Sequence, residues 1–125
     1  MNTIKIGLFF IFVFSVIPNV AFSDETSAKK WVKTAEDTMA LAESTVKELI
    51  EKGIEEISKR NDAVREEWKS AGQWLSLAKK KLDEAKKLCI DKKWDECENI
   101  ANESWQYLVK AATAAINAGR AAGIK

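Results

Sequence analysis

The sequence contains no histidine, and its single proline and all five phenylalanines lie within the first 22 residues. Histidine is the usual general base near neutral pH and a favoured ligand of transition metals. Its absence removes the Ser-His-Asp triad and the commonest zinc sites. Glycine-rich phosphate loops and the G-x-S-x-G pattern are also missing from the sequence. We therefore predict that the protein is not an enzyme, with no catalytic residue, metal site or cofactor.

The N-terminus has the pattern of an export signal. A lysine precedes the apolar run 6–17, Pro18 ends that run, and small residues occupy the −3 and −1 positions of a cleavage point after Ser23. The run is shorter than the about 20 residues that span a bilayer core, although an uncleaved signal-anchor is the alternative. We predict a signal peptide over 1–23, followed by a single exported domain over 24–125 that is periplasmic or secreted.

The charge of the predicted domain is balanced. Apart from Lys5, the chain carries 19 basic and 19 acidic residues, all within 24–125. A nucleic-acid-binding domain needs a dominant basic face, so this balance argues against a nucleic-acid partner. A domain of about 100 residues can bury a modest core and benefits from a covalent staple.

Three stretches place small or apolar residues at alternating steps of three and four, the spacing of helices packed lengthwise as in a coiled coil. The first comprises Val32, Ala35, Met39, Ala42, Val46 and Leu49. The second comprises Ala71, Leu75, Ala78, Leu82, Ala85 and Cys89. The third comprises Trp94, Cys97, Ala101, Ser104, Leu108, Ala111, Ala115, Ala118 and Ala122. These stretches predict an all-α fold: a three-helix antiparallel bundle made of an N-terminal helix and a long hairpin over 71–122, which turns at 90–93.

The boundary between the first two helices is less clearly marked. Near Gly53 the apolar stripe shifts by one residue and continues as Ile50, Ile54 and Ile57, so this glycine marks either a bend or a close contact. The polar segment 58–62 has the residues of a helix end and a new cap, and we predict the chain reversal there. The alternative is one continuous rod, which would need a partner chain to cover its stripe.

The two cysteines lie on either side of the predicted hairpin turn. A lone pair in an exported chain is usually a disulfide, and facing seams would bring Cys89 and Cys97 together. Closing this short loop should stabilise the fold by about 2–3 kcal/mol. A redox-active pair is the alternative, but the C-x-x-C spacing that lowers a thiol pKa is absent.

Tryptophans are the main aromatic residues of the predicted domain. They are Trp31, Trp68, Trp74, Trp94 and Trp105. The favoured interpretation is that they fill the core, and the alternative is an aromatic cleft or an exposed patch for a ligand or partner. Trp31 and Trp68 are expected to be the most exposed of the five.

Lysines gather toward the end of the second helix, at Lys79, Lys80, Lys81, Lys86 and Lys87. We expect a solvated face whose charges meet the acidic residues of the other hairpin arm. Those acidic residues are Asp95, Glu96, Glu98 and Glu103. The alternative is a surface for anionic lipid or an acidic partner.

The hairpin over 75–115 resembles the alanine-rich helical hairpins of periplasmic coiled-coil proteins, a resemblance that implies a fold and assigns no functional residue. The function predicted from all these features is binding, as a scaffold or adaptor for another protein, which includes a second copy of the chain. The alternative is a carrier of lipid or of a small apolar ligand, whose amphipathic helices open around it.

Overall fold

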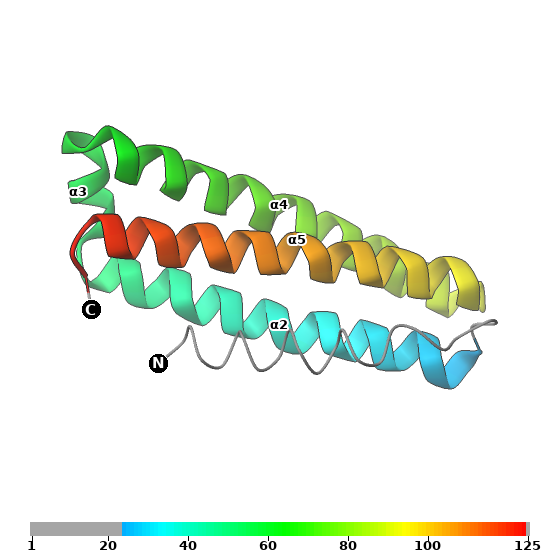
Figure 1. Ribbon diagram of the computed structural model, residues 1–125. Coiled ribbons are helices and arrows are strands. Elements are labelled where there is room, and N and C mark those ends of the chain that lie inside the picture. Colours follow the sequence, from blue (N-terminus) through cyan, green and yellow to red (C-terminus); the bar gives the residue numbers. More distant parts are fainter. Residues whose placement is uncertain (1–23, 125) are drawn as a thin grey trace.

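The computed structural model describes residues 24–124, which form the helices α2 (Glu25–Glu51), α3 (Ile54–Arg60), α4 (Asp62–Ile90) and α5 (Trp94–Ala121) (Figure 1). The three long helices lie lengthwise, with α4 antiparallel to α2 and α5, and α3 lies at one end. The all-α class and the helical bundle are confirmed. The predicted number of three helices is wrong, because α3 is a separate fourth helix. The predicted signal peptide lies outside the part of the chain that the structure describes.

The extra helix arises at Gly53. This residue has a φ of +88°, in the left-handed region where a residue with a side chain is strained, and it separates α2 from α3. The chain changes direction there, so the apolar stripe does not continue along one axis. Ile54 is fully buried, whereas Ile50 is 43% exposed. The expectation that Ile50 belongs to a buried stripe was therefore wrong.

The predicted break over residues 58–62 is confirmed, although the bend at Gly53 contributes part of the chain reversal. Asn61 has an extended backbone, and its side-chain oxygen accepts a hydrogen bond from the Val64 amide at 3.2 Å. The guanidinium group of Arg65 donates to the carbonyls of Ser58 and Lys59, at 3.1 and 3.0 Å. These contacts satisfy backbone groups at the end of α3 and the start of α4. The alternative of one continuous rod is excluded by this break.

Helix α5 is the central helix, because both α2 and α4 pack more extensively against it than against each other. Most residues of its predicted seam are buried, and so are Trp105, Ala112, Ala114 and Gly119. A helix with neighbours on two sides buries a wider arc than a single seam. Small residues let the neighbours approach closely: a Cβ atom at Gly119 would lie 2.8 Å from the Cδ2 atom of Leu49.

The core consists of two clusters along the bundle. The disulfide-side cluster comprises Trp31, Ala35, Met39, Ala42, Ala78, Leu82, Ala85, Ala101, Trp105, Leu108 and Ala112. The α3-side cluster comprises Leu49, Ile54, Val64, Ala71, Ala114, Ala115 and Ala118. Most of these residues come from the three predicted seams, which are thereby confirmed as the packed faces of the helices.

The buried hydroxyl groups of Thr38, Thr45 and Ser104 have hydrogen-bond partners. Thr38 and Thr45 donate to the backbone carbonyls four residues earlier, at 2.8 and 3.0 Å, which allows these hydroxyl groups to be buried. The hydroxyl group of Ser104 donates to the carbonyl of Ala78 at 2.8 Å and so joins α5 to α4. Within residues 24–124, no helix is both long enough and apolar enough to cross a membrane.

Candidate functional site

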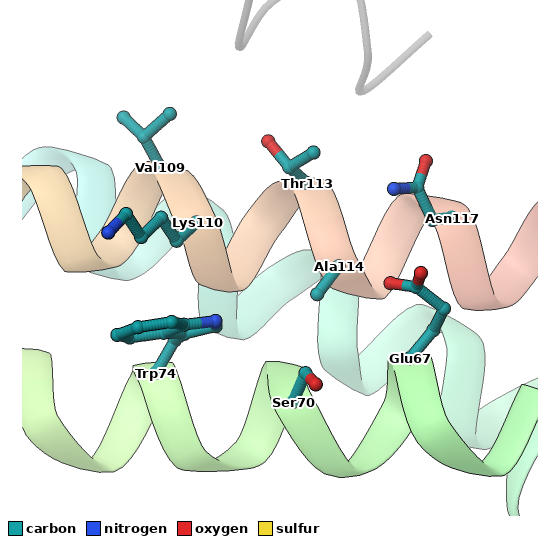
Figure 2. Close-up of a pocket in the computed structure, with 8 residues that line it drawn as sticks. All are labelled: Glu67, Ser70, Trp74, Val109, Lys110, Thr113, Ala114 and Asn117. Carbon is teal, nitrogen blue, oxygen red and sulfur yellow. The ribbon is translucent and has the colours of Figure 1, made fainter.

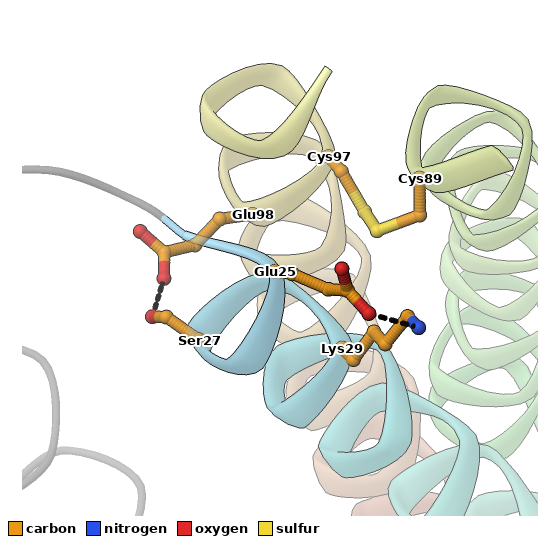
Figure 3. The surroundings of a disulfide bond; sticks show 6 residues. All are labelled: Glu25, Ser27, Lys29, Cys89, Cys97 and Glu98. Atoms are coloured by element: carbon orange, nitrogen blue, oxygen red, sulfur yellow. Dashed lines mark hydrogen bonds and ion pairs between the residues drawn. A yellow bond between two sulfur atoms is a disulfide. The ribbon is translucent and has the colours of Figure 1, made fainter. Parts of the chain in front are cut away.

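The hairpin turn carries the disulfide that the sequence predicts. Cys89 lies in the last turn of α4 and Cys97 in the first turn of α5, with their Cα atoms 5.3 Å apart. Figure 3 shows the bond beside the start of α2, where Ser27 donates a hydrogen bond to the Glu98 carboxylate. This end of the bundle is therefore closed by a covalent bond and by a contact between α2 and α5.

Trp31 and Trp105 lie in the core. They are 6% and 3% exposed, and their rings meet edge to face with centroids 6.2 Å apart. The expectation that Trp31 is exposed was wrong, because α2 turns this residue toward α5, where Trp105 offers a large apolar surface. Trp68 is half-buried and packs against the α3-side cluster.

Trp74 has different surroundings, on the face shared by α4 and α5. It is half-buried and stacks on Tyr107, with ring centroids 5.5 Å apart and planes 18° apart. The ammonium group of Lys110 lies 4.6 Å from the centroid of the Trp74 ring, a cation–π contact. Trp94, at the first position of α5, is half-buried. The five tryptophans are thus spread along the bundle.

The lysines of α4 meet acidic groups on two neighbouring helices. Lys81 approaches Glu103 of α5 at 3.9 Å, across the hairpin as expected. Lys79 and Lys86 instead approach Glu43 and Glu36 of α2, at 3.2 and 3.0 Å. Positions 79 and 86 are seven residues apart, so both lie on the face of α4 that is turned toward α2. Exposed pairs of this kind contribute about 0–1 kcal/mol each. Lys80 and Lys87 are exposed.

An open groove of about 310 Å³ runs between α4 and α5 (Figure 2). The residues that line this α4–α5 groove are Glu67, Ser70, Trp74, Val109, Lys110, Thr113, Ala114 and Asn117. In Figure 2, Glu67 and Trp74 rise from α4 with Ser70 between them, and Lys110 lies above the indole. The groove offers one carboxylate, one ammonium group, two hydroxyl groups, an amide and an indole edge. These groups suit recognition of a polar segment by hydrogen bonds.

An exposed apolar residue adjoins this groove. Leu77 is 42% exposed and lies three residues after Trp74 and four before Lys81. Residues at this spacing share one helix face. Because Trp74 contacts Tyr107 and Lys81 approaches Glu103, this face is turned toward α5. Leu77 therefore extends the α4–α5 groove with an apolar surface.

A second groove, of about 430 Å³, lies between α2 and α4. The residues that line this α2–α4 groove are Glu43, Val46, Lys47, Ile50, Glu51, Leu75 and Lys79. The groove exists because α2 and α4 both pack mainly on α5 and leave a space between their outer flanks. Trp74 and Lys79, which were predicted from the sequence as surface residues for a ligand or partner, each line one of these grooves. The grooves themselves could not be predicted, because the pattern of a seam shows which residues face inward and gives no measure of how closely two helices approach.

The sequence matches no protein-family model, and no curated protein or solved structure is significantly similar to it. In the described part of the chain, no three carboxylates or cysteines lie close enough together to hold a metal ion. Function is therefore inferred from the two grooves and from the chemistry of their residues.

Proposed function

We propose that this chain is an exported helical-bundle protein that acts by binding another protein, as a scaffold or adaptor, without catalysing a reaction. The N-terminal signal pattern supports export. The disulfide supports it as well, because such bonds persist mainly in oxidising compartments.

The observation that carries the binding proposal is the composition of the α4–α5 groove. Protein interfaces are enriched in tryptophan and tyrosine, and their core is surrounded by a polar rim. Here Trp74 and Tyr107 form a stacked pair that is held in place by Lys110, with Leu77 exposed beside them. Side chains that are already ordered lose little entropy on binding.

The charges of the groove define the segment that would fit. Lys110 lies on α5 and Glu67 lies on α4, separated along the groove by Ser70 and Ala114 (Figure 2). A matching protein segment presents an acidic group toward Lys110, a basic group toward Glu67 and an apolar side chain against Leu77. Such complementarity fixes the register of a complex and disfavours wrong partners.

Export can be tested by the mass of the purified, unreduced product. We expect a chain that begins at Asp24 and that lacks two hydrogen atoms relative to the reduced form, because Cys89 and Cys97 are joined. Retention of residues 1–23, or two free thiols, would contradict this part of the proposal.

Binding can be tested by parallel capture from the exported fraction of the host with the wild-type protein, Lys110→Glu and Lys87→Glu. Lys87 is an exposed lysine near the disulfide end and serves as the matched control. A partner should be retained by the wild type and by the control and lost from Lys110→Glu.

That partner, purified, should then be titrated directly. Trp74→Ala should weaken its binding at least tenfold, the effect of losing an interface residue worth about 1.4 kcal/mol. Equal binding by the wild type and Trp74→Ala would show that the partner binds elsewhere, and would reject the α4–α5 groove as its binding site.

The carrier function remains a second proposal, which the apolar residues of the α2–α4 groove support. An apolar ligand that separated α2 from α4 would also change the packing of α2 on α5, which includes the edge-to-face contact between Trp31 and Trp105. Titration with neutral and then anionic phospholipid vesicles would show this as a shift in tryptophan emission. An unchanged spectrum with both kinds of vesicle rejects the carrier function.

A further inference from the structure

We propose that the α2–α4 groove is a self-association surface, through which two copies of this chain form a two-fold symmetric dimer with their α2 helices antiparallel. This surface is separate from the α4–α5 groove. Trp74 and Leu77 lie on the flank of α4 that faces α5, whereas Leu75 and Lys79 line the groove toward α2.

The apolar part of the surface is centred on Ile50. Its side chain is 43% exposed, and it lines the groove together with the half-buried Val46 and Leu75. A single exposed apolar residue is ordinary, but three that line one open groove form a patch that a second helix can cover. In a two-fold arrangement, each Ile50 lies near the symmetry axis and is buried by the other copy.

The charges beside Ile50 are self-complementary, so they favour a second copy of this chain as the binding partner. Lys47 precedes Ile50 and Glu51 follows it, and both are exposed. Where the last turns of two antiparallel α2 helices overlap around Ile50, Lys47 of each copy lies opposite Glu51 of the other. A two-fold contact needs such self-complementarity, because each residue pair occurs twice. The remaining rim charges, Glu43 and Lys79, already neutralise each other at 3.2 Å.

On α4, small exposed residues lie next to Leu75. Gly72 and Ser76 are exposed, and they lie on either side of Leu75 in the sequence. A Cβ atom at Gly72 would meet no other atom within 4 Å. Glycine within a helix costs about 1 kcal/mol relative to alanine, and no contact within residues 24–124 requires it at this position. Its small size leaves room for the helix of a second copy to approach α4.

A dimer would allow this protein to act as a scaffold with two binding sites. Each copy keeps its α4–α5 groove on the opposite flank of α4, so two copies present two grooves. A partner with two matching segments would then bind with an avidity above the affinity of either groove alone.

The first test measures the mass in solution by sedimentation over a wide range of concentrations, for the wild type, Ile50→Glu and Leu77→Glu. Leu77 is the matched control, since its 42% exposure equals that of Ile50 within a percentage point. We expect a reversible dimer for the wild type and Leu77→Glu, and a dissociation constant at least tenfold larger for Ile50→Glu. A wild-type monomer at every concentration overturns the inference, as does a dimer that only Leu77→Glu disrupts.

The second test concerns the antiparallel orientation. Lys47→Glu and Glu51→Lys each place like charges opposite one another and should weaken the dimer. The double variant Lys47→Glu/Glu51→Lys exchanges the signs and should restore most of the association. Circular dichroism of each variant confirms that the helices are intact. Failure of the double variant to recover association rejects the antiparallel arrangement, and neither test depends on binding at the α4–α5 groove.

Discussion

The two ends of the bundle hold the same three long helices together by different means. At the disulfide end, a covalent bond closes the hairpin turn, and two tryptophans in edge-to-face contact join α2 to α5. At the other end there is no covalent bond among the described residues, and α3 bridges α2 and α4 over a core in which Leu49, Ile54 and Val64 are buried among alanines. Alanine is the commonest residue of both core clusters, so the size of most core side chains does not distinguish the two ends. They differ in how the chain is closed: by a disulfide and a tryptophan pair at one end, and by a short helix followed by the capped start of α4 at the other.

The largest expected effect comes from Trp105→Ala, which removes the aromatic contact of the disulfide side. Trp105 is almost fully buried, so the loss of apolar burial and the remaining cavity should lower the free energy of unfolding by about 3–5 kcal/mol. Denaturant unfolding followed by circular dichroism measures this change. Trp74→Ala, at a half-buried position, is the control and should cost less.

The second-largest loss of stability should come from removing the disulfide. In the double variant Cys89→Ala/Cys97→Ala, we expect a loss of about 2–3 kcal/mol in unfolding free energy, with helicity retained. Amide hydrogen exchange should accelerate most in the turns next to residues 89–97 and least around α3. Uniform acceleration over the whole bundle would show that the two ends are not held independently.

At the α3 end, the cap of α4 is the feature that one substitution can remove. Asn61→Ala leaves the Val64 amide without its side-chain acceptor, which should cost about 1 kcal/mol. Denaturant unfolding measures this loss of stability. Amide hydrogen exchange should accelerate most around Arg60 and Asp62. If exchange were faster only at the disulfide end, the cap would have no part in holding α3 against α4.

The smallest expected effect is an increase in the free energy of unfolding, and its size depends on which glycine is replaced. Gly72→Ala should raise the free energy of unfolding by up to about 1 kcal/mol, since the added methyl group meets no other atom. Gly119→Ala should be less favourable, because its Cβ atom would lie 2.8 Å from Leu49. The difference between the two melting temperatures measures how tightly Leu49 packs against α5. Equal gains would show that Leu49 moves aside freely.

The features that depend on local sequence could be predicted. The seams follow from the helical period, the hairpin from the polar turn between two seams, and the disulfide from cysteines placed on either side of that turn. Asn61 was identified as part of a break because its side chain can cap the next helix. Each of these inferences needs only residues a few positions apart.

The features that depend on distant residues could not be predicted. Trp31 is buried because Trp105, far along the chain, lies against it. Lys79 and Lys86 pair with α2 because their face of α4 is turned toward that helix, which the seam pattern alone does not establish. The grooves depend on the distance between helix axes, which side chains from three helices determine together. A bend at Gly53 was one of two possibilities that the sequence left open, and the left-handed backbone at this residue produces it.

The central position of α5 has a consequence for the order in which the chain folds. The hairpin pairs neighbouring segments, so α4 and α5 can associate as soon as both have been synthesised. Of the helices in residues 24–124, α2 is made first, but its main partner, α5, is made last. Until α5 appears, the apolar face of α2 has no surface to cover it, and exposed apolar segments of this kind are prone to aggregation. Among the described helices, α2 is therefore synthesised first and packed last, and its apolar face needs protection from aggregation until α5 has been made.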